Sequence, residues 1–273
     1  MNIKRIIRMP FLRALADVSF VSVAGALILL GTQAKASDTK VLDEKAVIEI
    51  IRAEIARDPG FVLDAINKHV EQQQALERQK QDGKAVVARD EIAASAGRPF
   101  VGAEQAAVEL VYFFDVNCGY CKRLDPAIRR IVEENKDIRV SHREIPILAE
   151  SSRSAALLSN IVWQMFPGKY GEFHDALMAN QGSLTDDILE VKLSEVLGAT
   201  DAMAVLAEAS NQNSEIMKKA TKLVQENLSL AEKAGVTGTP FVYVLQNDAV
   251  MRGAGEDAYD QLLGFINAAR SKK

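Results

Sequence analysis

The sequence is poor in the residues that build metal centres. Its 273 residues include only two cysteines, three histidines and one tryptophan. A structural zinc site takes about four cysteine or histidine ligands. The histidines, His69, His142 and His174, stand at none of the spacings seen in zinc fingers. We therefore expect no metal site, and we interpret His142 and His174 as structural side chains.

An excess of positive charge is also absent. Lysine and arginine number 33 against 37 aspartates and glutamates, which gives a net charge of −4. This balance argues against a nucleic acid as partner. Aromatic residues make up only 6% of the chain, and the many alanines favour a helix-rich protein.

Long hydrophobic runs are missing beyond the N-terminus. At the N-terminus itself, the apolar segment Val18–Gly31 follows four basic residues, Lys4, Arg5, Arg8 and Arg13. The segment is shorter than the roughly 20 residues of a membrane span. The small residues Ala34 and Ala36 then fit a cleavage site. We predict a signal peptide over residues 1–36 and export of a chain that starts near Ser37, with a membrane anchor as the alternative.

The two cysteines stand together in the run Cys118-Gly119-Tyr120-Cys121, after an apolar strand-like segment and before a helix-like one. The free N–H groups and the dipole of a helix N-terminus favour an anion. This position lowers the pKa of the Cys118 thiol and makes its thiolate a nucleophile. Cys121, one turn later, is placed to resolve a mixed disulfide. A bond between them closes a very small ring, which constrains little chain, so redox catalysis is favoured over a structural role.

Residues 37–97 are predicted to form a helical association region and a linker. Val47, Ile48, Ile51 and Ile55 recur at helical spacing, and Pro59 begins a second amphipathic helix that fades near Gln81. The linker spans Gly83–Gly97 with weak helical content. We expect the apolar faces of these two helices to be buried, either by docking on the main domain or by self-association.

Residues 98–273 are predicted to form an α/β domain. The segments Ala107–Phe114, Gly119–Glu134 and Ile138–Ile145 are typical of a strand–helix–strand unit with the cysteines at its first turn, the setting of a thioredoxin-like redox motif. A helical block over 152–212 follows. Four elements then complete a thioredoxin fold with a helical insertion: Ser214–Ala234, Phe241–Leu245, Ala249–Arg252 and Glu256–Arg270.

A second motif, Gly238-Thr239-Pro240, stands at the entrance of the strand that begins at Phe241. A Thr-Pro pair in this place suits a cis peptide bond. In a thioredoxin fold the loop lies beside the cysteine pair, where its backbone groups can bind an extended peptide.

The chain resembles the exported DsbA-like thioredoxin-fold oxidoreductases, and within them the suppressor-of-copper-sensitivity C type disulfide isomerases. The resemblance covers about Phe100–Ala269 well and the N-terminal helical extension more loosely. Four stretches carry it: Tyr112–Arg123, Arg143–Leu148, Lys169–Met178 and Gly235–Phe241.

The resemblance implies a periplasmic disulfide isomerase that needs no cofactor beyond its cysteine pair. In it Cys118 attacks, Cys121 resolves, and Gly119, Tyr120, Thr239 and Pro240 contact the substrate. Its partners would be exported proteins with disulfides or thiols and a membrane protein that resets the pair. It would form a homo-oligomer, with a trimer as first expectation and a dimer as second.

Three alternatives stay open: a monomeric dithiol oxidase, a Cu(I)-handling protein that holds the soft metal between Cys118 and Cys121, and an interaction protein with a vestigial redox site. One residue departs from the family pattern. Tyr112 replaces the buried glutamate that many relatives use to accept the proton of the resolving thiol. A water or another carboxylate, such as Glu144, would then have to take over this step.

Overall fold

The computed structural model describes residues 43–94 and 96–272, and the expected signal peptide lies outside them. No helix in this described part is both long and apolar enough to cross a membrane. The chain divides into two compact units, Met1–Pro59 and Gly60–Lys273.

Helix α1 (Glu44–Arg57) is the described element of the first unit. The Asp43 carboxylate accepts a hydrogen bond of 2.7 Å from the Ala46 N–H and so caps the helix. None of its described residues is buried. Helix α2 (Pro59–Val87) begins at the proline, as predicted, because the fixed φ of proline suits the first helical turn.

The prediction of a linker over Gly83–Gly97 is wrong for most of its length. Helix α2 continues through Gly83 to Val87, and helix α3 (Arg89–Ala93) follows directly. Ala85 and Ile92 are fully buried in a hydrophobic cluster of the main domain. The burial of these side chains outweighs the weak helix propensity of glycine. The predicted boundary at residue 97 therefore lies after residues that already belong to the core.

Among the described residues, five strands form one mixed sheet in the order β1-β3-β2-β4-β5. They are β1 (Phe100–Gly102), β2 (Val108–Phe114), β3 (Ile138–Glu144), β4 (Phe241–Val244) and β5 (Ala249–Arg252). Strands β2 and β3 are parallel and connected by helix α4 (Gly119–Glu134), whereas the other pairs are antiparallel. The predicted strand–helix–strand unit is therefore present with nearly the predicted bounds.

The two faces of the sheet bury different helices. Leu110 and Tyr112 of β2 point into a large cluster with α4 and α10 (Ala258–Arg270). Val111 and Phe113, which alternate with them, pack on α9 (Glu215–Lys233), α3 and the end of α2. The alternation follows from the two-residue period of a strand.

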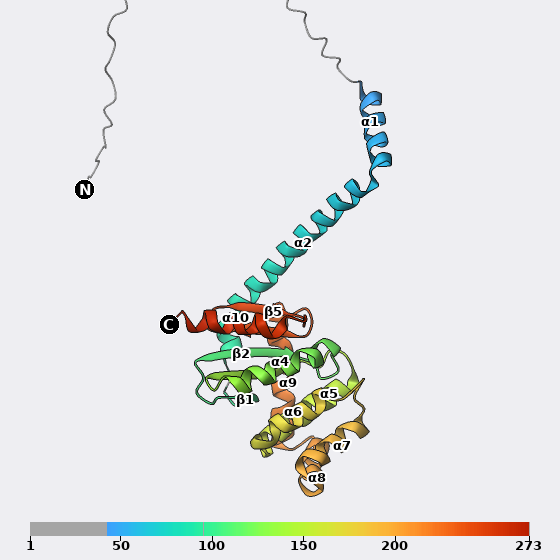
Figure 1. The fold of residues 1–273 in the computed structure, drawn as a ribbon. Coiled ribbons are helices and arrows are strands. Elements are labelled where there is room, and N and C mark those ends of the chain that lie inside the picture. Colours follow the sequence, from blue (N-terminus) through green and yellow to red (C-terminus); the bar gives the residue numbers. More distant parts are fainter. Residues whose placement is uncertain (1–42, 95, 273) are drawn as a thin grey trace, which may run out of the picture. The chain divides into compact units, whose positions relative to one another are not determined.

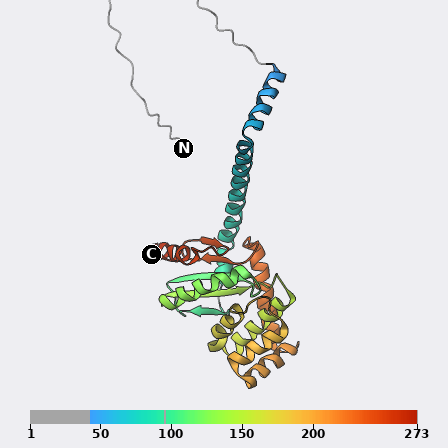
Figure 2. The same cartoon turned by 45° about the vertical axis from the view of Figure 1, so that its right-hand side comes forward.

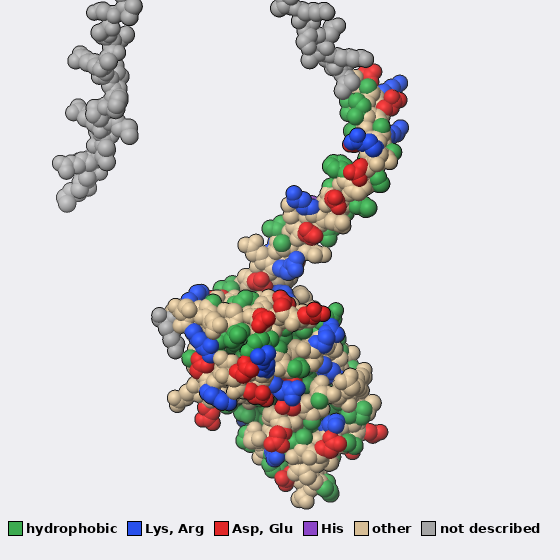
Figure 3. Space-filling model, in the orientation of Figure 1, with side chains coloured by type: hydrophobic (Ala, Val, Ile, Leu, Met, Phe, Trp, Pro, Cys, Tyr) green, Lys and Arg blue, Asp and Glu red, His purple; other side chains and the backbone are tan. Residues whose placement is uncertain are grey.

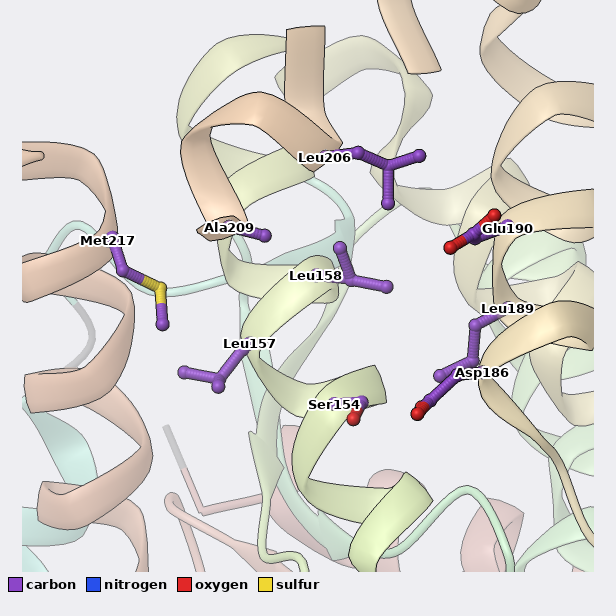
Figure 4. Close-up of a pocket in the computed structure, with 9 residues that line it drawn as sticks. All are labelled: Ser154, Leu157, Leu158, Asp186, Leu189, Glu190, Leu206, Ala209 and Met217. Atoms are coloured by element: carbon purple, nitrogen blue, oxygen red, sulfur yellow. The ribbon is translucent and has the colours of Figure 1, made fainter. Parts of the chain in front are cut away.

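Four α-helices and a short 3₁₀ turn lie between β3 and α9 and form the predicted helical block. They are α5 (Glu150–Met165), η1 (Pro167–Lys169), α6 (Tyr170–Met178), α7 (Asp186–Leu197) and α8 (Ala199–Ser210). Figures 1 and 2 show α5 to α8 gathered at one end of the domain. A hollow of about 260 Å³ in this block is lined by leucines, Met217, Asp186 and Glu190 (Figure 4), and no cysteine or histidine lines it in the described part of the chain.

Gly235 ends α9 at the point where α2 meets the domain. Its φ of +69° is a conformation that favours glycine, and a Cβ here would lie 2.5 Å from Gln81 Oε1. Nearby, Asp82 of α2 forms a 2.7 Å ion pair with Arg252 of β5. The last turns of α2 are thus fixed to the domain by the close approach of Gln81 to Gly235 and by a charge pair.

Candidate active site

Cys118 stands immediately before α4, as its N-cap residue. Its backbone N–H donates to Asp115 O at 2.9 Å, and its sulfur accepts from the Cys121 N–H at 3.4 Å. Both cysteines are free thiols, with Cys118 6% and Cys121 0% exposed. The structure thus brings the pair to the helix start that the sequence indicated.

The Thr239-Pro240 loop lies against Cys118. Thr239 O lies 3.3 Å from the Cys118 sulfur, a hydrogen bond that Cys118 donates in its thiol form, and the Thr239-Pro240 peptide bond is cis. The sheet explains this contact. Antiparallel pairing places Phe241, at the start of β4, opposite Phe113, at the end of β2. The loop before β4 and the loop after β2 therefore meet at one edge.

The two thiols have opposite acidities. The pKa of Cys118 is lowered to about 5, first by the hydrogen bond from the Cys121 thiol and then by donors on Thr239, Tyr120 and the Cys121 backbone, although burial opposes the shift. The pKa of Cys121 is raised, first by burial and then by its donation to Cys118. At neutral pH Cys118 is a thiolate and Cys121 a thiol, the arrangement needed for one attacking and one resolving sulfur.

Asp115 organises the loops around the pair, a role that sequence reasoning missed. Its fully buried carboxylate accepts from Asn117 N and Ser152 Oγ, each at 2.8 Å. It also accepts from Ile147 N at 2.9 Å and Leu148 N at 3.0 Å. Asp115 thereby joins the cysteine turn to the loop after β3 and to α5. Its place three residues before Cys118 marks Asp115 as a neighbour of the cysteine turn, but the sequence does not indicate its hydrogen bonds.

Apolar side chains are exposed beside this framework. Tyr120 is 56%, Ile147 50% and Leu148 55% exposed. The Arg123 guanidinium lies over the Tyr120 ring, 4.1 Å from its centroid. Lys122 donates to Asn180 O at 2.9 Å and to Gly182 O at 2.6 Å, which ties α4 to the helical block. Sequence reasoning included Tyr120 as a substrate contact but not Ile147 or Leu148.

Behind Cys121 lies Tyr112, the residue that departs from the family pattern. The tyrosine is fully buried, and its hydroxyl has no hydrogen-bonding nitrogen or oxygen within the described residues. Burial, followed by the charges of Cys121 and Asp125, raises the pKa of Tyr112 well above its usual range. The hydroxyl therefore stays protonated and faces the resolving thiol.

A polar cluster continues from there. Asp125, 2% exposed, accepts from His174 Nε2 at 2.9 Å and pairs with Arg129 Nε at 3.2 Å. The His142 ring lies 4.3 Å from the His174 ring, and its Nδ1 is 2.7 Å from the Tyr170 hydroxyl. Oxygen and nitrogen atoms of Asp125, His174 and Asp175 come within 4.8 Å of one another. Arg129 already supplies a positive charge to both carboxylates, so the geometry gives no reason to add a metal ion.

Known proteins with the same fold carry related sequences. The chain is 27% identical to "Disulfide bond formation protein D" of Bacillus subtilis over 61% of its own length and 74% of that protein. It is similar to a periplasmic thioredoxin-like protein from Salmonella enterica serovar Typhimurium, with 29% identity, a TM-score of 0.56, and coverage of 66% and 96% of the two chains. It also resembles ScsC of Proteus mirabilis in a compact conformation, with 28% identity, a TM-score of 0.59, and coverage of 84% and 99%.

The family model of the DSBA-like thioredoxin domain matches residues 109–267. This range includes both cysteines, the Thr239-Pro240 loop and the helical block, and it is more than half of the chain. With its thiol pair at a helix start beside a Thr-Pro loop, the protein belongs to the DsbA-like family of thiol–disulfide oxidoreductases.

Proposed function

We propose that the protein is a disulfide isomerase of exported proteins, with Cys118 as the attacking and Cys121 as the resolving thiol. The thiolate of Cys118, with its pKa of about 5, attacks a substrate disulfide and forms a mixed disulfide. The substrate then rearranges and expels Cys118, or Cys121 attacks Cys118 and releases a reduced substrate. A membrane protein resets the cysteine pair.

The proposed substrate contacts are Gly119, Tyr120, Thr239 and Pro240, and we include Ile147 and Leu148 because their side chains are exposed beside the cysteine turn. The Thr239 carbonyl oxygen lies 3.3 Å from the Cys118 sulfur, where backbone groups can bind an extended chain. The exposed side chains of Tyr120, Ile147 and Leu148 offer apolar area to unfolded substrates. Cu(I) binding by the two thiols stays a separate prediction.

The observation that favours isomerisation over simple oxidation is the exposed apolar face of α1. Val47, Ile48, Ile51 and Ile55 recur on one side of the helix and are between 39% and 51% exposed. Leu63, Ile66 and Val70 form a similar row on α2. Figure 3 shows hydrophobic side chains among the charged ones on each helix. Full burial of such a side chain contributes about 1.5–3 kcal/mol, so several together can drive association.

Self-association through these rows has a functional consequence. A closed oligomer, with a trimer as our first expectation and a dimer as the second, surrounds a misfolded substrate with several Cys118 thiolates. Repeated attack on one substrate favours isomerisation. The N-terminal basic and apolar segments, together with the periplasmic relative from Salmonella, support a periplasmic location.

The test compares two reactions of the mature chain, refolding of scrambled ribonuclease and oxidation of reduced ribonuclease, while light scattering gives the mass. The decisive variant replaces Ile48, Ile51 and Ile55 with glutamate. We expect it to be monomeric, to lose about tenfold or more of the isomerase rate, and to keep its rate with a small disulfide, since the cysteine site is untouched.

Val191→Glu is the matched control, because Val191 is 54% exposed on α7, within the helical block. We expect this variant to keep both mass and isomerase rate. If the unaltered mature chain is a monomer at micromolar concentration and oxidises better than it isomerises, the protein is an oxidase and the proposal fails.

A further inference from the structure

A groove beside the cysteine turn carries positive charge that the proposed function does not use. It has a volume of about 520 Å³ and follows the start of α4 and the segment after α6. Its lining includes Gly119, Lys122, Arg123, Arg129, Asn180 and Gly182. Because Gly119 directly follows Cys118, a group bound at this end of the groove lies close to the attacking sulfur.

Cations are in excess in this groove. Among the described residues that line it, Asp125 is the only carboxylate, against the three cations Lys122, Arg123 and Arg129. Asp125 is already paired, because Arg129 Nε lies at 3.2 Å and His174 Nε2 at 2.9 Å from its oxygens. Lys122 and Arg123 form no ion pair with a carboxylate in the described part of the chain. Their charge is therefore available to a negatively charged ligand.

Lys122 and Arg123 are held in different ways. Lys122 donates to the carbonyl oxygens of Asn180 and Gly182, which fix its position without neutralising its charge. Arg123 is exposed, and its guanidinium lies over the Tyr120 ring, 4.1 Å from the centroid. Stacking uses the face of the guanidinium and leaves open its five N–H donors, which lie in the plane of the group. No hydrogen bond within residues 43–94 and 96–272 engages these donors.

A guanidinium in this state is prepared to bind a carboxylate. Its planar fork can donate two parallel hydrogen bonds to the two oxygens of one carboxylate. The contact of Arg123 with Tyr120 already orders the side chain, so less entropy is lost when a ligand binds. The acidic side chains of a protein substrate are carboxylates that arrive together with its disulfide.

We propose that the groove beside Lys122 and Arg123 binds an acidic side chain of the substrate, so that the protein prefers disulfides whose cysteines have acidic neighbours in the chain. The Arg123 guanidinium hydrogen-bonds the carboxylate, and Lys122 contributes a second positive charge. This inference rests on the proposed role of Cys118 as the attacking thiol, and it adds a charged preference to the apolar contacts of Tyr120, Ile147 and Leu148.

The experiment measures how fast the reduced mature protein attacks three peptides with blocked ends. Each peptide has one cysteine in a mixed disulfide with thiopyridine, flanked on both sides by glutamates, by glutamines or by lysines. The Cys118 thiolate forms a bond to the peptide sulfur. The bond to thiopyridine breaks, and its electron pair leaves with the coloured thiopyridine. This leaving group carries no carboxylate, so any preference for acid comes from the peptide.

We expect the second-order rate constant of the glutamate peptide to exceed that of the glutamine peptide about five- to tenfold at low salt, and the lysine peptide to react most slowly. Salt at about 0.5 M should reduce this preference to about twofold, because the groove is open to solvent. Each rate constant is divided by that of the same peptide with 2-mercaptoethanol, which removes differences in the reactivity of the peptides themselves.

Three variants of Arg123 test the role of this residue. Arg123→Gln should lower the ratio of the glutamate to the glutamine peptide to about one to two, and Arg123→Glu should lower it to one or less. Arg123→Lys should keep part of the preference, because a point charge remains while the paired hydrogen bonds are lost. A change in the acidity of Cys118 alters the rates of all three peptides alike and leaves their ratios unchanged.

Lys219→Glu is the matched control, because it makes the same change in net charge as Arg123→Glu at an exposed position of α9 that does not line the groove. We expect it to keep the preference. The proposal is overturned if the unaltered protein shows no preference, if Arg123→Glu retains it, or if Lys219→Glu loses it to the same extent.

The glutamine peptide tests the proposed function separately, because it brings no carboxylate to the groove. If Cys118→Ala attacks this peptide as fast as the unaltered protein does, the assignment of Cys118 is wrong, and the inference about the groove fails with it. If the glutamine peptide depends on Cys118 but the glutamate peptide reacts no faster, only the inference about the groove fails.

Discussion

The N-terminal helices and the interior around the cysteines depart from the usual distribution of side chains in opposite directions. Helix α1 keeps Ile48, Ile51 and Ile55 in solvent, whereas the interior holds Asp125 and Arg143 almost completely buried. An exposed apolar row costs free energy unless another surface covers it, and a buried charge costs free energy unless it is paired or hydrogen-bonded. The outer departure supports the self-association proposed above, whereas the buried charged groups are held by ion pairs and hydrogen bonds within the fold.

The largest expected effect tests whether the cysteine pair carries out thiol–disulfide exchange. In Cys118→Ala the rate of thiol–disulfide exchange should fall by about 10⁴-fold or more, because the nucleophile is missing. Cys121→Ala should keep the first attack and accumulate mixed disulfides, which gel electrophoresis without reductant detects. If Cys121→Ala loses the first attack and Cys118→Ala keeps it, the roles are reversed.

The next effect tests the buried cation. Arg143 donates to the carbonyl oxygens of His142 at 3.2 Å, Ile92 at 3.3 Å and Ala94 at 3.2 Å, and it thereby fastens the segment after α3 to the sheet. Arg143→Ala should lower the free energy of unfolding by about 2–4 kcal/mol, because buried carbonyls lose their donors.

Urea titration measures this difference. The matched control is Arg139→Ala on the same strand, where the half-buried guanidinium lies over the Phe100 ring. Arg139→Ala should lower the free energy of unfolding by only about 1 kcal/mol, which is typical of a cation on an aromatic face. If the two variants lose the same free energy of unfolding, the buried hydrogen bonds of Arg143 do not add to stability.

A third effect appears in the pH dependence of stability. The pKa of Cys118 is about 5 in the folded protein and about 8.5 in an unfolded chain. Because the pKa of Cys118 is lower in the folded protein, the thiolate stabilises the reduced protein fully at a pH above the pKa of the unfolded chain. This contribution is lost as the pH falls to the pKa of the folded protein.

The stability of the reduced protein relative to Cys118→Ala should therefore rise between pH 5 and about 8.5, by up to about 1.4 kcal/mol per pH unit. Denaturant titrations across this range measure it. A difference that stays flat with pH would mean that the folded protein does not stabilise the thiolate.

The smallest effect concerns apolar exposure near the cysteines. Changing Ile147 and Leu148 to serine should lower kcat/KM for a disulfide-containing peptide by about five- to tenfold, because apolar contact with substrate is lost. The rate with a small disulfide should not change. Val191→Ser, exposed to a similar extent on α7, is the control and should leave both rates unchanged.

Local patterns in the sequence were sufficient to predict most of the elements. The helix after Cys118, the start of α2 at Pro59 and the hairpin partner Ala249–Arg252 were all located correctly. Each depends on neighbours along the chain: a cap, a fixed φ or a two-residue alternation. For the same reason the cysteine pair and its helix-start position were visible without a structure.

Long-range packing decided what local patterns could not. Gly83 suggested a linker, but burial of Ala85 and Ile92 against the sheet keeps that stretch helical. Asp115, only three residues before Cys118, gave no sign that its carboxylate would join two loops and a helix.

The buried polar cluster behind Cys121 depends on the tertiary structure most of all. Tyr112, Asp125 and His174 come from β2, α4 and α6, and the fold alone brings them together. The sequence by itself determined the thiol pair, the α/β pattern and the apolar N-terminal rows, because spacing within one element suffices for those. Only the tertiary structure decided which buried groups surround the cysteine pair, because that choice depends on contacts between residues far apart in the chain.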